Sequence, residues 1–258
     1  MSLLPKEHGA YGQIAFPILT AFVVAGVSTG GLLIATTVIA GFLAHEPAAI
    51  LLGIRGPRAK REWWHHAALR LGCTLVVGVT AGAGALFLVD VPTRWSLLVP
   101  LAPTLLLAMW TERGRDKSWE GEVAGSLAFS GAAMPISLAA PAPAQTGAAV
   151  AIPFALLFVA STLAIRVVIL RVRGGGNAGG TTATRRATFF IAAGAASALG
   201  AACTLDLLPT STFVASAPGL LISTLIAAHP PAPSHLRTLG WILVGTSVLT
   251  AAILVATV

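Results

Sequence analysis

Long apolar stretches alternate with short polar connections along the whole chain. Each stretch holds about 20 residues, the length of helix that crosses the roughly 30 Å hydrocarbon core of a bilayer. The pattern therefore predicts nine transmembrane helices, at residues 11–29, 31–53, 66–89, 95–112, 123–142, 147–170, 187–205, 211–229 and 236–257. The predicted fold class is an all-α, polytopic membrane helical bundle, in which residues 1–258 form a single transmembrane domain.

Two of the connections are short and well marked. Only Ser28, Thr29 and Gly30 join the first two predicted spans, so these spans should form a tight helical hairpin. A Pro-rich turn at residues 141–145 separates the fifth span from the sixth. The residue before a proline is pushed out of helical backbone angles, which favours a helix end at this point.

The basic residues collect in every second connection. All of the 16 Lys and Arg side chains except Arg94 lie on one side of the predicted membrane. Basic loops are retained in the cytoplasm, so the N terminus should be cytoplasmic and the C terminus extracytoplasmic. The predicted location is the cytoplasmic (inner) membrane of a bacterium, with all large polar loops inside the cell.

The composition supports this location and excludes other classes of protein. The chain is 56% hydrophobic and 10% charged, whereas soluble domains carry about 25% charged residues. Its net charge of +7 does not indicate nucleic-acid binding, because the basic residues are junction residues of membrane spans. The first ten residues show no cleavable signal pattern, so the first apolar run should stay as an anchor.

No metal or disulfide pattern is evident in the sequence. Cys73 and Cys203 lie within apolar stretches, where a free cysteine behaves as a small hydrophobe. The six His residues form no zinc motif. The glycine-rich segment at 174–180 lacks the Lys-Ser/Thr pair of a P-loop, and we interpret it as a flexible linker.

Several predicted helices are rich in Gly and Ala, notably at residues 78–86, 121–133 and 192–202. Small residues let helices approach closely in lipid, where burial of apolar surface does not itself drive association. We therefore predict close helix packing in these stretches. A substrate groove lined by the same residues is the alternative.

Polar residues at the first two spans are the first candidates for chemistry. Lys6 could bind an anion, and His8 could transfer a proton or hydrogen-bond a head group; the alternative is a helix cap with interfacial anchors. Glu46 lies inside the second predicted span, where an ionised carboxylate is costly and normally faces a partner. It is either a functional group or half of a structural ion pair with Arg55 or Arg166.

The segment after the second span, GIRGPRAKREWWHH, is interpreted as an interfacial loop that combines basic and aromatic residues. Trp63 and Trp64 are typical of residues that anchor a loop at the membrane surface. Arg58 and Arg61 would alternatively form a site for an anionic lipid or a phosphate.

The connections after the fourth and sixth spans hold the remaining candidates. Carboxylates at residues 112–122, among them Glu120, could hold Mg²⁺ or could be neutralised by the basic residues beside them. Arg166 and Arg171 form a basic edge at the end of the sixth span. Arginine suits bidentate phosphate binding, but at the end of a span it also commonly extends to the interface.

Four segments resemble one family of bacterial integral membrane proteins, the YwiC-like family. The opening PKEHGAYGQIAFP is similar to its PK(E/Q)HGAW motif, and FLAHEPAAILLGIRGPRAKR to its second-span signature. TERGRDKSWEGEVAG resembles the acidic segment after its fourth span, and IRVVILRVRGGGN the Arg-containing end of its sixth. The resemblance implies a multi-span membrane protein without an assigned reaction.

The span count and the polar loops after spans two and six also resemble the UbiA-type intramembrane prenyltransferases. That resemblance implies binding of a Mg²⁺-diphosphate group by two Asp-rich motifs in those loops. This chain has neither an NDxxDxxxD motif nor a DxxxD motif. Mg²⁺ is therefore disfavoured as a cofactor, and whether the chain is an enzyme is left open.

The functional hypothesis is a polar cavity that opens to the cytoplasm between spans one, two, four and six. It would bind, and in a stronger form of the hypothesis transfer, an amphipathic anionic substrate such as an isoprenoid or lipid phosphate. The residues expected to bind the head group are Lys6, Arg58, Arg61, Arg166 and Arg171, and those expected to be proton-transfer or metal-linked groups are His8, Glu46 and Glu120. Glu46 and Arg166 are expected to share one polar cluster. A membrane transporter or a non-catalytic subunit of a partner complex are the alternatives.

Overall fold

The computed structural model describes residues 8–115, 118–173 and 178–258, and every regular element in these ranges is helical. The elements are α1 (His8–Ala25), α2 (Thr29–Leu51), α3 (Pro57–Leu88), α4 (Val91–Ser96), α5 (Leu98–Glu112), α6 (Trp119–Gly131), α7 (Ala133–Leu138), α8 (Ala144–Arg173), α9 (Ala178–Thr204), α10 (Thr210–Ala228), η1 (Pro233–His235) and α11 (Leu236–Thr257). In the described ranges, seven helical stretches are long and apolar enough to cross a membrane, with α4 and α5 counted together. The predicted all-α membrane bundle is confirmed.

Two of the predicted spans are interrupted. The fourth is divided into α4 and α5, and the fifth into α6 and α7. Pro100 and Pro135 lie four residues after Ser96 and Gly131, the last residues of α4 and α6. A proline has no N–H for the carbonyl four residues earlier, and its ring clashes with that carbonyl. The two prolines therefore account for both breaks.

Two helices, α3 and α9, begin nine residues earlier than predicted. α3 begins at Pro57 rather than at residue 66, so the basic and aromatic segment that we expected as a loop is helical. Gly56 precedes it with φ +96°, an angle that glycine adopts without strain, and Pro57 fixes the first helical φ. α9 begins at Ala178, so the predicted glycine linker is partly helical, while residues 174–177 lie outside the described residues.

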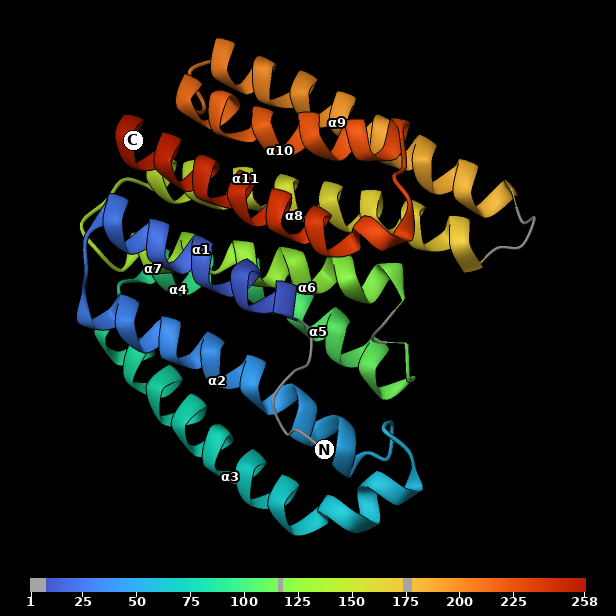
Figure 1. The fold of residues 1–258 in the computed structure, drawn as a ribbon. Helices are drawn as coiled ribbons and strands as arrows, with labels where there is room; N and C mark the ends of the chain where they lie inside the picture. Colours follow the sequence, from blue (N-terminus) through green and yellow to red (C-terminus); the bar gives the residue numbers. More distant parts are fainter. Residues whose placement is uncertain (1–7, 116–117, 174–177) are drawn as a thin grey trace.

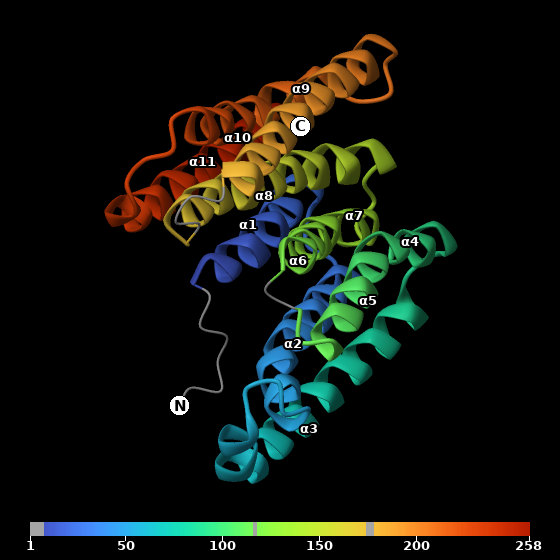
Figure 2. The same ribbon diagram turned by 90° about the vertical axis from the view of Figure 1, so that its right-hand side faces the viewer.

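The helices form a bundle around α1, which packs against α6, α7, α8 and α11 (Figure 1). α8 in turn packs against α9 and α10, which form one edge of the molecule in both views. The hairpin of α2 and α3 forms the opposite edge (Figure 2). It reaches the rest of the bundle mainly through the packing of α2 against α7. The tight hairpin predicted for the first two spans is not found, because α1 packs mainly against α6, α7, α8 and α11 while α2 packs against α3.

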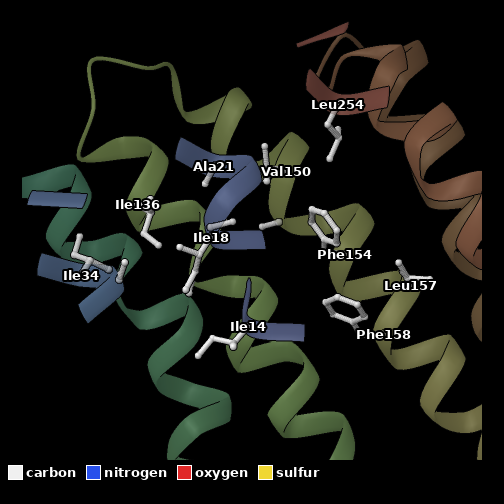
Figure 3. Close-up of a cluster of buried hydrophobic side chains, with 14 of the residues drawn as sticks. Ile14, Ile18, Ala21, Ile34, Ile136, Val150, Phe154, Leu157, Phe158 and Leu254 are labelled. Carbon is white, nitrogen blue, oxygen red and sulfur yellow. The ribbon is translucent and has the colours of Figure 1, made fainter. Parts of the chain in front are cut away.

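The main apolar core joins the central helices. Ile18 of α1, Ile136 of α7, and Val150 and Phe154 of α8 are buried and lie together, with Leu254 of α11 at the margin (Figure 3). Their packing connects α1 to helices from both halves of the sequence. The core therefore fixes the position of α8, which carries Arg166.

The predicted close packing of small residues is found in two of the three stretches. In α6, a Cβ added to Gly131 would lie 3.2 Å from Cγ1 of Val99 on α5. A Cβ added to Gly78 of α3 would lie 3.2 Å from the Cβ of Ala40 on α2, so this glycine permits the tight α2–α3 hairpin. In α9, a Cβ added to Gly194 or Gly200 would meet nothing within 4 Å. The prediction of close packing was therefore wrong for these two glycines, which lie on an open part of the helix surface.

Candidate functional site

The connections that carry basic residues lie at one end of the bundle. Successive spans run in opposite directions, which brings the α2–α3, α5–α6, α8–α9 and α10–α11 connections to the end where α1 begins (right in Figure 1). Arg94, in α4, lies at the other end. We call the first end the basic end. Among the described residues, the ion pairs at this end include Arg55–Glu46, Arg58–Glu62, Arg115–Glu120 and Arg166–Glu122.

Glu46 is paired with Arg55 in a bidentate arrangement. Arg55 Nε donates to Glu46 Oε1 at 3.1 Å, and Arg55 Nη2 donates to Oε2 at 2.9 Å. Glu46 is only 6% exposed, and the pair links α2 to the turn that precedes α3. The ion-pair alternative is confirmed with Arg55 as partner.

The ion pairs in the described part of the chain do not join Glu46 to Arg166, as the expected polar cluster would require. Arg166, on α8, instead donates from Nη1 to Glu122 Oε2 of α6 at 3.4 Å. A second pair lies beside it, in which Arg115 Nη2 donates to Glu120 Oε1 at 3.2 Å. We call Arg115, Glu120, Glu122 and Arg166 the corner cluster, because it lies where the α5–α6 connection meets α8.

The local sequence explains the two directions of the carboxylates. Ser118 is the N-cap of α6, and its hydroxyl accepts from the N–H of Gly121 at 3.4 Å. Glu120 and Glu122 are therefore both in the first turn, where the helix dipole favours negative charge. Two helical residues that are two positions apart point to different sides, so one glutamate meets Arg115 and the other meets α8.

The corner cluster is partly open to its surroundings. The side chains of Arg166 and Glu122 are 26% and 43% exposed, so their pair is not sealed inside the bundle. Oε2 of Glu120 is enclosed and has no hydrogen-bond partner among the described residues. The Ser118 hydroxyl, the backbone N–H of Glu120 and the charges of Arg115 and Arg166 together lower the pKa of Glu120. Glu120 is therefore a carboxylate at neutral pH, and its lowered pKa makes it a weaker proton acceptor than an ordinary glutamate.

The other predicted head-group residues are not gathered at this cluster. Arg58 and Arg61 lie on the first turns of α3, at the edge of the molecule away from α8 (Figure 2). Arg171 donates from Nη1 to the carbonyl of Pro230 at 2.9 Å and so links α8 to the connection after α10. Lys6 lies outside the described residues. His8 begins α1, and its side chain is also outside what the structure describes.

Sequence reasoning included Glu122 only as one of the carboxylates at residues 112–122, without a partner, and it missed a contact among three aromatic rings. A capping serine followed by two glutamates in the next turn is a local signal that would have placed Glu122 on a helix. The rings of Tyr11 and Phe42 lie 5.1 Å apart, and those of Phe42 and Phe129 lie 5.5 Å apart, both edge to face. They join α1, α2 and α6, and no local pattern indicates a contact between segments so far apart in the sequence.

Metal-ligating side chains are not grouped at the basic end in the part of the chain that the structure describes. No group of three or more His, Cys, Asp or Glu residues there could hold a metal ion. Two apolar hollows instead lie on α3 and between α2 and α3, and Cys73 and Val77 line both. Two expectations therefore stay predictions. One is the polar cavity between spans one, two, four and six, and the other is the minor role of Mg²⁺.

Comparison with known proteins places the chain in a family. Residues 4–137, just over half of the chain, match the family model described as YwiC-like protein. This range contains the opening motif, the second-span segment and the acidic segment of α5–α6, and it ends before Arg166. No curated protein and no solved structure matches the chain significantly. With its helical membrane fold, the chain belongs to the YwiC-like family.

Proposed function

We propose that this YwiC-like protein binds an amphipathic molecule whose anionic head group is held at the corner cluster. The observation that carries the proposal is the position of Arg166. Its guanidinium projects from the basic end of a long apolar helix, and its ion pair with Glu122 is long and partly exposed. The tail of the ligand would lie against the apolar surfaces of the bundle.

The geometry of this pair leaves room for a better partner. The Nη1–Oε2 distance of 3.4 Å exceeds the roughly 2.7–2.9 Å of a strong charge-assisted hydrogen bond. A guanidinium presents five donors in a plane that matches the oxygens of a phosphate or carboxylate. Glu122 is exposed enough to turn toward solvent when such a group arrives. Arg115, across Glu120, would add a second cation.

The ligand class that fits is an isoprenoid phosphate or a lipid phosphate. Positive charge at the basic end favours a cytoplasmic location for the cluster in a bacterial inner membrane. Glu120, whose Oε2 has no hydrogen-bond partner among the described residues, would be the proton-transfer group if the bound molecule is also transformed. The missing Asp-rich motifs lead us to expect that Mg²⁺ adds little to binding.

The test compares two ligands that share one tail. The purified protein in detergent is heated with farnesyl diphosphate or with farnesol, and the unfolding midpoint is recorded. We expect the diphosphate to raise the midpoint more than the alcohol does, with or without Mg²⁺. In Arg166→Gln, the apparent affinity for the diphosphate should fall about tenfold or more, because a hydrogen bond to a charged group contributes about 1.5–3 kcal/mol.

Arg185→Gln is the matched control, because Arg185 is an exposed arginine on α9 outside the corner cluster. It should bind the diphosphate like the native protein. Equal stabilisation by farnesol, or equal losses in both variants, would refute the proposed site. Since Arg166→Gln could also weaken the contact between α6 and α8, Arg115→Gln serves as a second variant at a more exposed position of the cluster, and it should also reduce the diphosphate effect.

A further inference from the structure

Helix α3 is longer than a membrane is thick. Its 32 residues extend about 48 Å at 1.5 Å per residue, compared with a hydrocarbon core of roughly 30 Å. Residues 71–88 contain no charged side chain and are about long enough to cross that core. Residues 57–70, which we call the α3 head, must therefore lie at or beyond the membrane surface at the basic end.

The α3 head is basic, aromatic and exposed. Its charged residues are four cations and one acid, which are Arg58, Lys60, Arg61, Arg70 and Glu62. The Arg58 side chain is 93% exposed, and its nearest carboxylate, on Glu62, is 3.9 Å away. At that distance and exposure, the pair does little to neutralise Arg58. The α3 head therefore carries an excess of accessible positive charge.

The shape of the α3 head matches a membrane surface. Figure 1 shows its first turns bent away from the direction of the rest of α3. Arg58, Arg61 and His65 are exposed at positions that share one side of a helix, and the same side continues into Leu69, which is 71% exposed. Trp64 is exposed beside this side, with the Lys60 ammonium 5.7 Å from its ring centre. Along this part of α3, charged residues come first, then a tryptophan, and then an apolar surface. This order is typical of a helix that lies at the membrane interface.

We infer that the α3 head is a binding surface for the anionic phospholipid head groups of the leaflet at the basic end. Its cations would contact the phosphates, and Trp64 would lie at the level of the head groups. This inference is independent of the proposed function, because the α3 head and the corner cluster lie on different helices at different edges of the bundle. It assigns Arg58 and Arg61 to lipid rather than to the substrate head group.

The experiment uses phosphatidylcholine nanodiscs that contain a small share of a photo-crosslinking phosphatidylglycerol probe. A phosphatidylcholine probe with the same crosslinker is the reference, and labelled peptides are mapped by mass spectrometry. We expect the phosphatidylglycerol probe to label residues 57–70 several times more than the reference does. In Arg58→Gln/Arg61→Gln, the labelling by the two probes should become nearly equal, because each cation near an anionic surface contributes a factor of about five.

Arg185→Gln/Arg186→Gln removes the same charge from exposed positions at the basic end of α9 and is the matched control. It should keep the labelling of residues 57–70. Equal labelling by both probes, or a preference that survives in Arg58→Gln/Arg61→Gln, would overturn the inference. The farnesyl diphosphate response is measured on the same variants, and its retention in Arg58→Gln/Arg61→Gln separates this surface from the site at Arg166.

Discussion

Glu46 is the residue whose role depends most on its partner. A carboxylate inside an apolar helix needs a compensating charge, and Arg55 supplies two parallel hydrogen bonds from only nine residues away. The pair closes the α2–α3 turn, in which Gly53 has φ +82°. We interpret Glu46 as a residue that positions the start of α3.

The first prediction at this scale concerns the coupling of Glu46 and Arg55. Glu46→Gln or Arg55→Gln should each destabilise the protein by about 1–3 kcal/mol, below the roughly 3–5 kcal/mol of a fully buried pair, because Arg55 is 17% exposed. The Glu46→Gln/Arg55→Gln double variant should lose less than the sum of the single losses. The losses are obtained from the unfolding midpoints of the native protein, the two single variants and the double variant, all measured in the same detergent.

Additive losses in that cycle would contradict the pairing, since residues that do not interact show independent effects. Glu62→Gln is the control, because Glu62 is exposed and its contact with Arg58 is 3.9 Å. It should change the midpoint very little, as expected of a surface pair.

At the scale of elements, local sequence explains where helices break. Pro100 and Pro135 end α4 and α6 four residues upstream, but Pro153 lies within α8 without interrupting it. A proline therefore permits a break in a helix but does not require one.

Contact between helices decides whether replacing a glycine by alanine stabilises or destabilises the protein. A Cβ added to Gly219 of α10 would lie 2.7 Å from Cδ1 and 3.2 Å from Cα of Leu157 on α8. We predict that Gly219→Ala destabilises the protein, because overpacking costs about 1–3 kcal/mol and exceeds the gain in helix propensity. The unfolding midpoint measured in detergent checks the result.

Gly200→Ala is the matched control on α9, where a Cβ would meet nothing within 4 Å. It should raise the midpoint slightly, since alanine is favoured over glycine in a helix by up to about 1 kcal/mol. A lower midpoint for Gly200→Ala than for Gly219→Ala would contradict the packing of α8 against α10.

For the whole molecule, the distribution of charge predicts the orientation in the membrane. The basic end should face the cytoplasm, with Val258 at the opposite face. A reporter that is active only outside the cytoplasm should work when fused after Val258 and fail when inserted at Gly56. A fluorescent protein that folds only in the cytoplasm should give the reverse pattern. Activity of the first reporter at Gly56 would show that the bundle is inverted.

The sequence by itself determined the fold class, the approximate spans and the separation of basic from non-basic connections. These features follow from local physical requirements, since a helix must match the thickness of the bilayer and a charge must remain outside it. The resemblance of the opening segments to the YwiC-like family was also readable from residues alone, and the match over residues 4–137 confirmed it.

Only the tertiary structure decided which charges meet. Glu46 had two candidate partners, and the turn after α2 brought Arg55 to it. Arg166 met Glu122, a residue 44 positions away, because the core places α8 against α6. Arg58 and Arg61 were separated from Arg166 because α3 packs along α2 at the far edge. Composition shows which residues need a partner, but the partner is set by the relative positions of helices that are distant in the sequence.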